Sequence, residues 1–442
     1  LLSKGIFEMR IFWSIFGIIA VYLMIIFTGV FMPSIYNSFF NTPIHNYRTI
    51  YVQTFHTYGA EFFYRPARTD QEGVTIHNPD KAYQGYTFLI SADKNEARLI
   101  DMEGNIVHSW QKDAEIVWGI SDIPGNKENM YIWTRGTLIP RSGQVYINTM
   151  TLDTLAEKYP GTMVLDEDSN IIRNSSLGSH HDIAIAPNGD AYILTGRLMD
   201  RPDADFPHII PPFIDEGLAV VSADGTLKKE ISFWELFKNS DLKIVLERLQ
   251  SKPLDPVLPE GDIFHTNSIS FVPDAAIGKA PMLKEGHIMV SFRNLDLMVM
   301  IDPENEEITW ASYGPWKGQH SPQILDDGTM LLFDNLGNLK EGGASRILRI
   351  DLNDLSIVWE YAGTKENPLH SWHSSHVKLL PNGNILITEA EGGRILEVTP
   401  EKEIVWEYIV PARYKFEEDD PDLIPVVFSG ARFTKDELGF LD

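Results

Sequence analysis

Histidines recur at one position of a repeated pattern in this chain of 442 residues. His181, His265, His320 and His376 each open a segment of alternating apolar residues, and His373 lies three residues before the last of them. A lone histidine inside a protein is usually structural, but histidines at matching places in a repeat predict a shared site. The pKa of imidazole lies near neutral pH, so such a site can bind a metal ion, exchange protons or attack an electrophile.

The neighbours of the histidines distinguish two kinds of chemistry. A metal site needs a carboxylate or a further imidazole, plus an open coordination position. Asp182 follows His181 and could supply the carboxylate, although successive side chains of a strand point in opposite directions. Arg293, in segment 291–294 after His265, is a poor neighbour for a metal cation, whereas its planar guanidinium suits sulfate or phosphate oxygens. The residues therefore favour anion transfer with a histidine nucleophile and predict neither a metal nor a cofactor.

A repeat of two elements predicts how these residues are positioned. The first element is a strand, an acidic turn and a second strand that often ends in Trp. The second element precedes most copies and has a polar start, an alternating strand, a Pro-Asn-Gly or Asp-Asp-Gly turn and another apolar strand. Copies of the first element are residues 100–110, 164–173, 221–227, 301–310, 350–359 and 398–406. Together the elements predict six blades of four antiparallel strands, an all-β propeller.

The propeller explains why histidines remote in sequence can meet. The first strand of each blade lines the central channel, so the strand-opening histidines should surround the axis. Two β-sandwiches with coincidental turns are the alternative, but they would not explain six matched pairs of hairpins. The first blade lacks a recognisable innermost strand, which residues 423–433 could supply, thereby closing the ring. Residues 235–250 carry the one good helical pattern, expected as an insertion on a blade.

The N-terminal region predicts a membrane anchor. Residues 11–32 carry no charge, and as a helix they would be about 33 Å long, enough to span a bilayer. A cleaved signal peptide is the alternative, but its apolar region is shorter and a small-residue cleavage site follows it. Lys4 and Arg10 precede the span and no basic residue follows before Arg48. The N-terminus is therefore expected in the cytoplasm and the remainder in the periplasm of a bacterium or outside the cell.

These signals divide the chain into four parts. They are a membrane anchor (1–33), a juxtamembrane segment (34–80), a propeller (81–415) and a C-terminal segment (416–442). The juxtamembrane segment is rich in Tyr and Phe. We expect it to lie along the membrane interface, to pack on a partner, or to join the core.

Composition excludes several classes of function. The formal net charge is −25 and no run of Lys and Arg is present, so a nucleic-acid partner is not expected. The chain has no cysteine, which excludes disulfides, thiolate chemistry and cysteine-based zinc sites. Hydrophobic residues make up 43% and charged residues 22%, so the chain can form a folded core.

Short motifs, in this order and spacing, resemble those of the bacterial arylsulfotransferase family. They are AYQGYTFL at 82–89, SHHDIAIAPN at 179–188, HTNSI at 265–269, SFRN at 291–294, Gln-His at 319–320 with Phe-Asp-Asn at 333–335, and PNGN at 381–384. The resemblance extends from about residue 75 to 415. It implies a six-bladed propeller in which an aryl sulfate gives its sulfuryl group to a histidine. The sulfohistidine then passes the group to a phenol, without a nucleotide sulfate donor.

The resemblance also implies roles for four residues. His320, the histidine followed by a Phe-Asp-Asn strand, matches the nucleophile of the family. His265 and Arg293 match the residues that hold the sulfuryl oxygens. His181 matches the acid or base for the phenolic oxygen. The chemistry suits these types, because neutral imidazole is a good nucleophile and cations stabilise the charge that spreads over the transferring group.

The sequence also departs from the family. Better-known soluble members carry an extra N-terminal β domain and cysteines, whereas this chain has a predicted anchor, and His373 and His376 lie outside the family pattern. Three functions follow. The favoured one is an arylsulfotransferase of the bacterial inner membrane, with its propeller in the periplasm, acting on aryl sulfates and phenols. The others are a non-catalytic scaffold or accessory subunit of a membrane complex, including a homo-oligomer, and a metal-dependent lyase or hydrolase.

Overall fold

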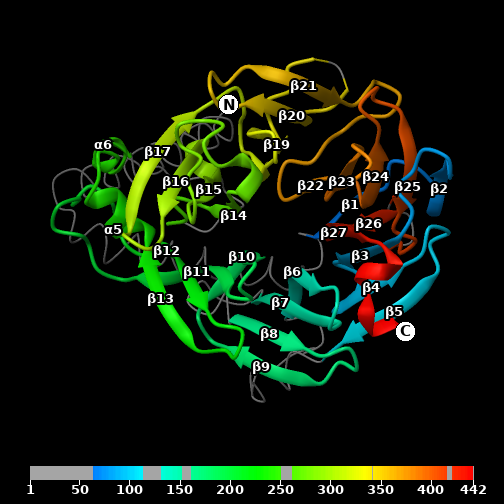
Figure 1. Ribbon diagram of the computed structural model, residues 1–442, viewed down its shortest axis with the longest axis horizontal. Helices are drawn as coiled ribbons and strands as arrows, with labels where there is room; N and C mark the ends of the chain where they lie inside the picture. The colour runs from blue at the N-terminus through cyan, green and yellow to red at the C-terminus, as the bar shows by residue number, and fades with distance from the viewer. Residues whose placement is uncertain are drawn as a thin grey trace, which may run out of the picture. The chain divides into compact units, whose positions relative to one another are not determined.

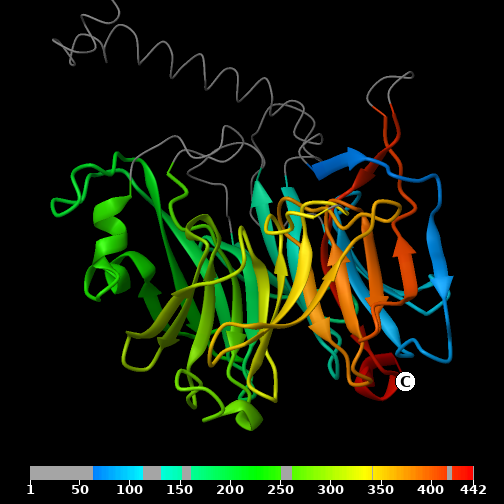
Figure 2. The same ribbon diagram turned by 90° about the horizontal axis from the view of Figure 1, so that it is seen from above.

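The computed structural model describes residues 63–112, 131–151, 161–249, 261–340, 342–415 and 421–441. Their strands form six antiparallel sheets arranged as blades around a channel, together with one separate two-stranded sheet (Figure 1). Seen from the side, the strands run between the two faces of the ring (Figure 2). The predicted all-β, six-bladed propeller is therefore confirmed.

Each blade has its innermost strand at the channel and three further strands outside it. Blade 1 has β27 (Val427–Phe433), β3 (Tyr86–Ser91), β4 (Glu96–Ile100) and β5 (Ile106–Gln111). Blade 2 has β6 (Tyr131–Ile139), β7 (Gln144–Thr151), β8 (Gly161–Leu165) and β9 (Ile171–Ser175). Blade 3 has β10 (Ser179–Ile185), β11 (Ala191–Met199), β12 (Phe213–Val221) and β13 (Leu227–Ser232).

The second half of the ring follows the same order. Blade 4 has β14 (Thr266–Phe271), β15 (Ile288–Phe292), β16 (Leu297–Asp302) and β17 (Glu307–Tyr313). Blade 5 has β18 (His320–Ile324), β19 (Thr329–Asp334), β20 (Arg346–Asp351) and β21 (Ile357–Ala362). Blade 6 has β22 (His376–Leu379), β23 (Ile385–Glu389), β24 (Arg394–Val398) and β25 (Ile404–Ile409), with β2 (Gly73–His77) added outside.

The ring is closed by the C-terminal strand β27, which pairs antiparallel with β3. This confirms that residues 423–433 can supply the missing inner strand of blade 1. The chain that precedes blade 1 is joined to blade 6, because β2 pairs with β25. A second short pair, β1 (Tyr64–Pro66) with β26 (Leu423–Pro425), links both ends of the described chain. Closure leaves no blade with a long exposed inner edge.

Polar side chains join the inner strands of neighbouring blades. Each accepts a hydrogen bond from a backbone N–H of the next inner strand, a donor that no sheet partner satisfies. The pairs are Asp182 Oδ2 with Ile269 N at 2.9 Å, Ser268 Oγ with Ser321 N at 2.8 Å, Ser270 Oγ with Ile324 N at 3.0 Å and Gln323 Oε1 with Leu379 N at 3.0 Å. Ser268 and Ser270 of β14 accept from Ser321 and Ile324 of β18, and Ser321 and Gln323 of β18 accept from Val377 and Leu379 of β22. Residue numbers increase in the same order on both strands of each pair, so these inner strands run in the same direction along the channel.

The helical segment differs from the single pattern expected over residues 235–250. The structure has two short helices, α5 (Phe233–Lys238) and α6 (Lys243–Arg248), at the outer rim of the ring (Figure 1). Ser232 caps α5 by accepting a hydrogen bond from the N–H of Glu235 at 3.0 Å. The break falls on Asn-Ser-Asp, residue types whose side chains compete with the helical backbone. The segment is an insertion on blade 3, as expected.

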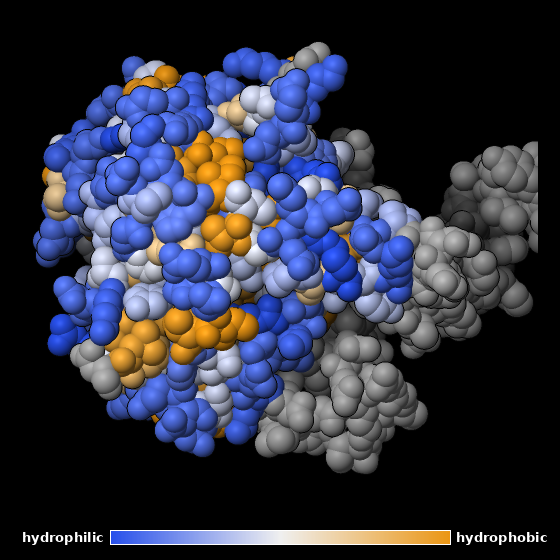
Figure 3. All heavy atoms as spheres, turned by 90° about the vertical axis from the view of Figure 1, so that its right-hand side faces the viewer, coloured by the Kyte–Doolittle hydropathy of each residue, from blue (hydrophilic) through white to orange (hydrophobic). Residues whose placement is uncertain are grey.

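The face of the ring shown in Figure 3 is mostly hydrophilic. Figure 3 shows the side of the ring at which β2 and β5 lie, where apolar groups are separated by hydrophilic residues. Exposed apolar side chains include Ile106 and Val107 of β5. Single exposed apolar residues are normal on the surface of a folded protein.

The anchor predicted at residues 11–32 lies outside the described residues, as does the juxtamembrane segment up to residue 62. Within the described part of the chain, no helix combines the length and the apolar character needed to cross a bilayer.

A buried arginine fastens the closing strand to blade 6, and its loss should be costly. Arg432 of β27 lies 3.3 Å from Glu397 of β24, and both side chains are fully buried. Its guanidinium carbon is 4.4 Å from the ring centre of Trp406. Replacing one partner leaves the other charge buried and unpaired, so Arg432→Met should lower the free energy of unfolding by about 3–5 kcal/mol. Denaturant unfolding followed by Trp fluorescence measures this loss.

The matched control is Lys435→Met, an exposed cation three residues later, which should leave the unfolding midpoint unchanged. The double variant R432M/E397Q should recover part of the loss, because it removes the unpaired carboxylate. An R432M protein as stable as the wild type would contradict the role of this pair.

Candidate active site

The four predicted site residues lie at one end of the channel. The rings of His181 and His265 are 4.6 Å apart, centre to centre. The backbone N–H of Arg293 donates to the carbonyl oxygen of His265 at 3.2 Å. The positive charge of Arg293 and the imidazole of His265 both act on the pKa of His320. The repeat therefore brought together residues from blades 3, 4 and 5.

The starts of the inner strands have an unusual backbone. His181, His265, Ser321 and Ser374 have φ between 47° and 54°, the left-handed region that residues other than glycine rarely adopt. The pairing of β10, β14 and β18 with the next strand shifts register at or within three residues of these positions. Such irregularities turn a side chain away from its regular direction. They occur where the histidines meet and are typical of strained functional sites.

The imidazole of His320 is held in one tautomer. Its Nδ1 lies 2.8 Å from Asn335 Oδ1 and 3.2 Å from the carbonyl oxygen of Gly318. Both oxygens are acceptors, so Nδ1 carries the proton and Nε2 carries the lone pair. The Asn335 amide is itself oriented, because its Nδ2 donates to the carbonyl oxygens of Ser371 at 2.8 Å and Ser374 at 3.1 Å.

The same imidazole is kept neutral. Burial, followed by the charge of Arg293, holds the pKa of His320 well below the ordinary histidine value, although the bond to Asn335 acts in the opposite direction. In this structure Nε2 accepts a hydrogen bond from the backbone N–H of Ser374 at 3.1 Å. An electrophile that reacts with Nε2 must therefore displace this N–H, which would then lie beside the bound group.

His265 and Arg293 are held by different means. His265 Nδ1 is 2.6 Å from Asp262 Oδ2, which orients its ring. The guanidinium of Arg293 donates to Asn294 Oδ1 at 3.0 Å and to the carbonyl oxygen of Trp372 at 3.3 Å. The arginine thus spans blades 4 and 6 beside the channel. A flexible side chain fixed at both ends is suited to hold oxygens of an anion at a fixed position.

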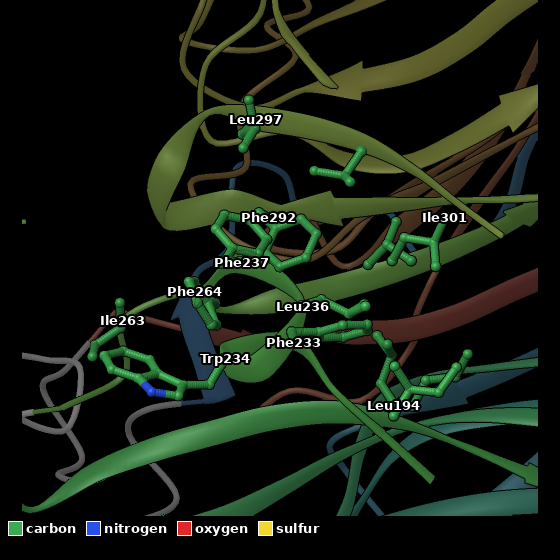
Figure 4. Close-up of a cluster of buried hydrophobic side chains, with 14 of the residues drawn as sticks. Leu194, Phe233, Trp234, Leu236, Phe237, Ile263, Phe264, Phe292, Leu297 and Ile301 are labelled. Carbon is green, nitrogen blue, oxygen red and sulfur yellow. The ribbon is translucent and has the colours of Figure 1, made fainter. Parts of the chain in front are cut away.

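An aromatic cluster supports this pair from outside. Phe264 precedes His265 and Phe292 precedes Arg293, and their rings are 5.5 Å apart in a T-shaped arrangement. Phe237 of α5 packs on both, with ring centres at 4.9 and 5.0 Å (Figure 4). The helical insertion on blade 3 therefore stabilises the positions of two site residues of blade 4.

His181 belongs to a chain of ionisable groups. Its Nδ1 is 2.7 Å from Nδ1 of His180, so one ring donates and the other accepts. His180 is buried, and its Nε2 lies 3.5 Å from Glu216 Oε1. A proton taken up by His181 can therefore be shared with a buried carboxylate. His180 and Glu216 were not predicted, although the adjacent histidine in the SHHD motif was a visible signal.

His376 contacts an arginine of blade 2. His376 Nε2 is 2.6 Å from Nη1 of Arg135, on β6, and loss of hydration followed by this cation holds the pKa of His376 well below the ordinary value. Arg135 is also paired with Asp182 at 2.9 Å. Asp182 therefore forms an ion pair with Arg135 and accepts a hydrogen bond from the backbone N–H of Ile269 in the next inner strand. No group of three or more metal-ligating side chains occurs among the described residues.

His373 lies next to the predicted nucleophile. Burial lowers the pKa of His373 to about 4, Glu391 opposes this shift and Arg293 contributes to it. Its Nδ1 is 3.8 Å from Glu391 Oε1. The sequence left His373 without a role, and the structure adds it to the imidazoles around Arg293.

The lowered histidine pKa values predict a stability that depends on pH. His320, His373 and His376 are neutral in the folded protein at pH values where unfolded histidine, with a pKa of about 6.5, binds a proton. The unfolded state then binds more protons, so the free energy of unfolding should fall as pH decreases from about 6.5 toward 4. Denaturant unfolding at a series of pH values measures the slope. His373→Gln should reduce this slope, and an unchanged slope would contradict the assignment.

A sequence model of the family described as Arylsulfotransferase (ASST) matches residues 159–411, which is more than half of the chain and includes all four predicted site residues. A solved protein of unknown function from Bacteroides caccae is 12% identical with a TM-score of 0.46, over 78% of this chain and 99% of that chain. A catalytically inactive virginiamycin B lyase from Staphylococcus aureus is 14% identical with a TM-score of 0.37, over 78% and 87%. No curated protein matches.

Proposed function

The chain belongs to the arylsulfotransferase family, and on that premise we propose that it transfers a sulfuryl group from an aryl sulfate to a phenol through a sulfohistidine at His320. The observation that carries the proposal is the state of this imidazole. Asn335 holds the proton on Nδ1, while burial and Arg293 keep the ring neutral, so Nε2 has a lone pair near pH 7. A nucleophile in this state needs no separate base to activate it.

The first half-reaction moves the sulfuryl group to the protein. Nε2 of His320 attacks the sulfur atom and forms the N–S bond, while the bond between sulfur and the aryl oxygen breaks. The aryl oxygen leaves with the electron pair and takes a proton from His181. Arg293 and His265 stabilise the negative charge that spreads over the sulfuryl oxygens in the transition state.

The second half-reaction is the reverse with a new phenol. His181 accepts the phenolic proton, the phenolic oxygen attacks sulfur and the N–S bond breaks, which returns the lone pair to Nε2. The backbone N–H of Ser374 donates to Nε2 before reaction. We assign it to a sulfuryl oxygen in the sulfohistidine, so that the donor is not left without an acceptor.

The test is sulfuryl transfer by the purified full chain. The expected result is release of 4-nitrophenol from 4-nitrophenyl sulfate that depends on an added phenol, with the sulfated phenol as second product. Without the phenol, a stoichiometric burst should leave one sulfuryl group on the protein, located by peptide mass spectrometry at His320. A protein that shows neither burst nor transfer, and that copurifies with a stoichiometric membrane partner, would support the scaffold function instead.

We also propose that residues 11–32 anchor the propeller in the bacterial inner membrane, with the propeller in the periplasm. The uncharged span and the basic residues before it support this orientation. In intact spheroplasts, external protease should then degrade the propeller. Protection of the propeller until the membrane is lysed would overturn the orientation.

A further inference from the structure

A cavity of about 870 Å³ lies within the ring, apart from the four predicted site residues. None of His181, His265, Arg293 and His320 lines it. Its walls begin with the residues that directly follow two of these histidines, Asp182 and Ser321, and continue along the inner strands to the turns beyond them. Because these strands run in the same direction, the cavity opens toward the other mouth of the channel.

An ion pair lies in the wall of the cavity. Arg135 of β6 lines the cavity and pairs with Asp182 of β10 at 2.9 Å. Its Nη1 also contacts His376 at 2.6 Å. The charge of Arg135 is therefore balanced by Asp182, so this cation already has a counter-ion within the protein.

Lys378 of β22 is different, because its charge is not balanced. Its side chain is exposed and lines the cavity. Among the residues that the structure describes, no carboxylate pairs with its ammonium group. Loss of hydration alone lowers the pKa of Lys378. An accessible ammonium in the wall of a cavity, without a carboxylate beside it, can pair with an anionic group of a bound molecule.

The other walls suit an apolar body. Tyr192 and Phe271 form a T-shaped pair with ring centres 5.0 Å apart, and both line the cavity. Asp274 and Asp326 are exposed lining residues in the turns after β14 and β18. The acidic turns disfavour ligands with several negative charges. A volume of this size is typical of sites for small organic molecules.

We propose that this cavity is a second binding site, for an organic monoanion whose carboxylate or sulfonate pairs with Lys378 and whose apolar part packs on Tyr192 and Phe271. His320 does not line this cavity, although the next residue, Ser321, does. This second site goes beyond the proposed sulfuryl transfer and does not depend on it.

The probe is 1-anilinonaphthalene-8-sulfonate, an aromatic monosulfonate, titrated into the purified full chain by calorimetry and fluorescence. Wild type should bind with a saturable site of one probe per chain. Lys378→Met should weaken binding by about tenfold or more, whereas Lys378→Arg should retain it, because it keeps the charge. Lys284→Met, an exposed lysine of the loop between β14 and β15, is the matched control and should bind as wild type does.

Two further measurements distinguish this cavity from the candidate active site. N-phenyl-1-naphthylamine, which lacks the sulfonate, should bind wild type and K378M equally and more weakly than the sulfonate binds wild type. Arg293→Met should leave binding of the sulfonate at this site unchanged. The proposal is overturned by no saturable binding, by equal binding to wild type and K378M, or by binding that is lost only in R293M. Lys378→Gln repeats the test if K378M has a lowered unfolding midpoint.

Discussion

Replacing His320 with asparagine should reduce sulfuryl transfer by roughly four orders of magnitude or more, the size of effect seen when a catalytic nucleophile is removed. The amide of Asn cannot form the N–S bond, while its size is close to that of imidazole and its side chain can still bond to Asn335. The reaction then has no covalent intermediate. The measurement is the steady-state rate of phenol-dependent 4-nitrophenol release together with the burst.

Two controls separate chemistry from folding. His208→Asn replaces an exposed histidine that bonds to the carbonyl oxygen of Leu246 and is not one of the four site residues, and it should leave the rate unchanged. The unfolding midpoint of H320N should remain within a few degrees of wild type. An H320N protein that folds normally and still accumulates a sulfuryl group in the burst would rule out His320 as the nucleophile.

Replacing Arg293 with methionine should lower the rate of transfer by about 10²–10³-fold, as expected for loss of one group that stabilises developing negative charge. The guanidinium is held by Asn294 and by the carbonyl oxygen of Trp372 beside the imidazole of His320. Arg293→Lys should fall between wild type and R293M, because ammonium keeps the charge but loses the planar pair of donors.

The pH profile gives a second, independent readout. The charge of Arg293 lowers the pKa of His320, so its removal should raise that pKa toward the ordinary value. At acidic pH more of the imidazole is then protonated and unable to attack. The acid limb of the rate profile should therefore move to higher pH in R293M and less in R293K. A loss of rate without any movement of the acid limb would place Arg293 outside the reach of His320.

Two kinds of prediction succeeded for a local reason. The alternation of apolar residues and the turns between strands are properties of neighbouring residues, so they could be recognised along the chain. They predicted the blades, and the shared place of His181, His265 and His320 in the repeat predicted that these residues meet. The helical span 235–250 was less accurate, because it ran across Asn239, Ser240 and Asp241, at which the structure separates α5 from α6.

Other features were decided by the closed ring alone. Arg135 lies on an inner strand that starts with no histidine, yet it contacts Asp182 of blade 3 and His376 of blade 6. The proton on Nδ1 of His320 is set by Asn335, and its Nε2 faces an amide from the start of β22. These contacts join blades across the channel, and their distances depend on closure and on left-handed residues at the strand starts.

The sequence by itself therefore determined the propeller, the histidine positions and the resemblance that marks His320. It could not determine the protonation of that imidazole, the ion pair between Arg135 and Asp182, or the unbalanced charge of Lys378. The physical reason is the same in each case. A residue type and its period are local properties, whereas a pKa, an ion pair or a missing counter-ion depends on atoms that come together only when the ring is closed.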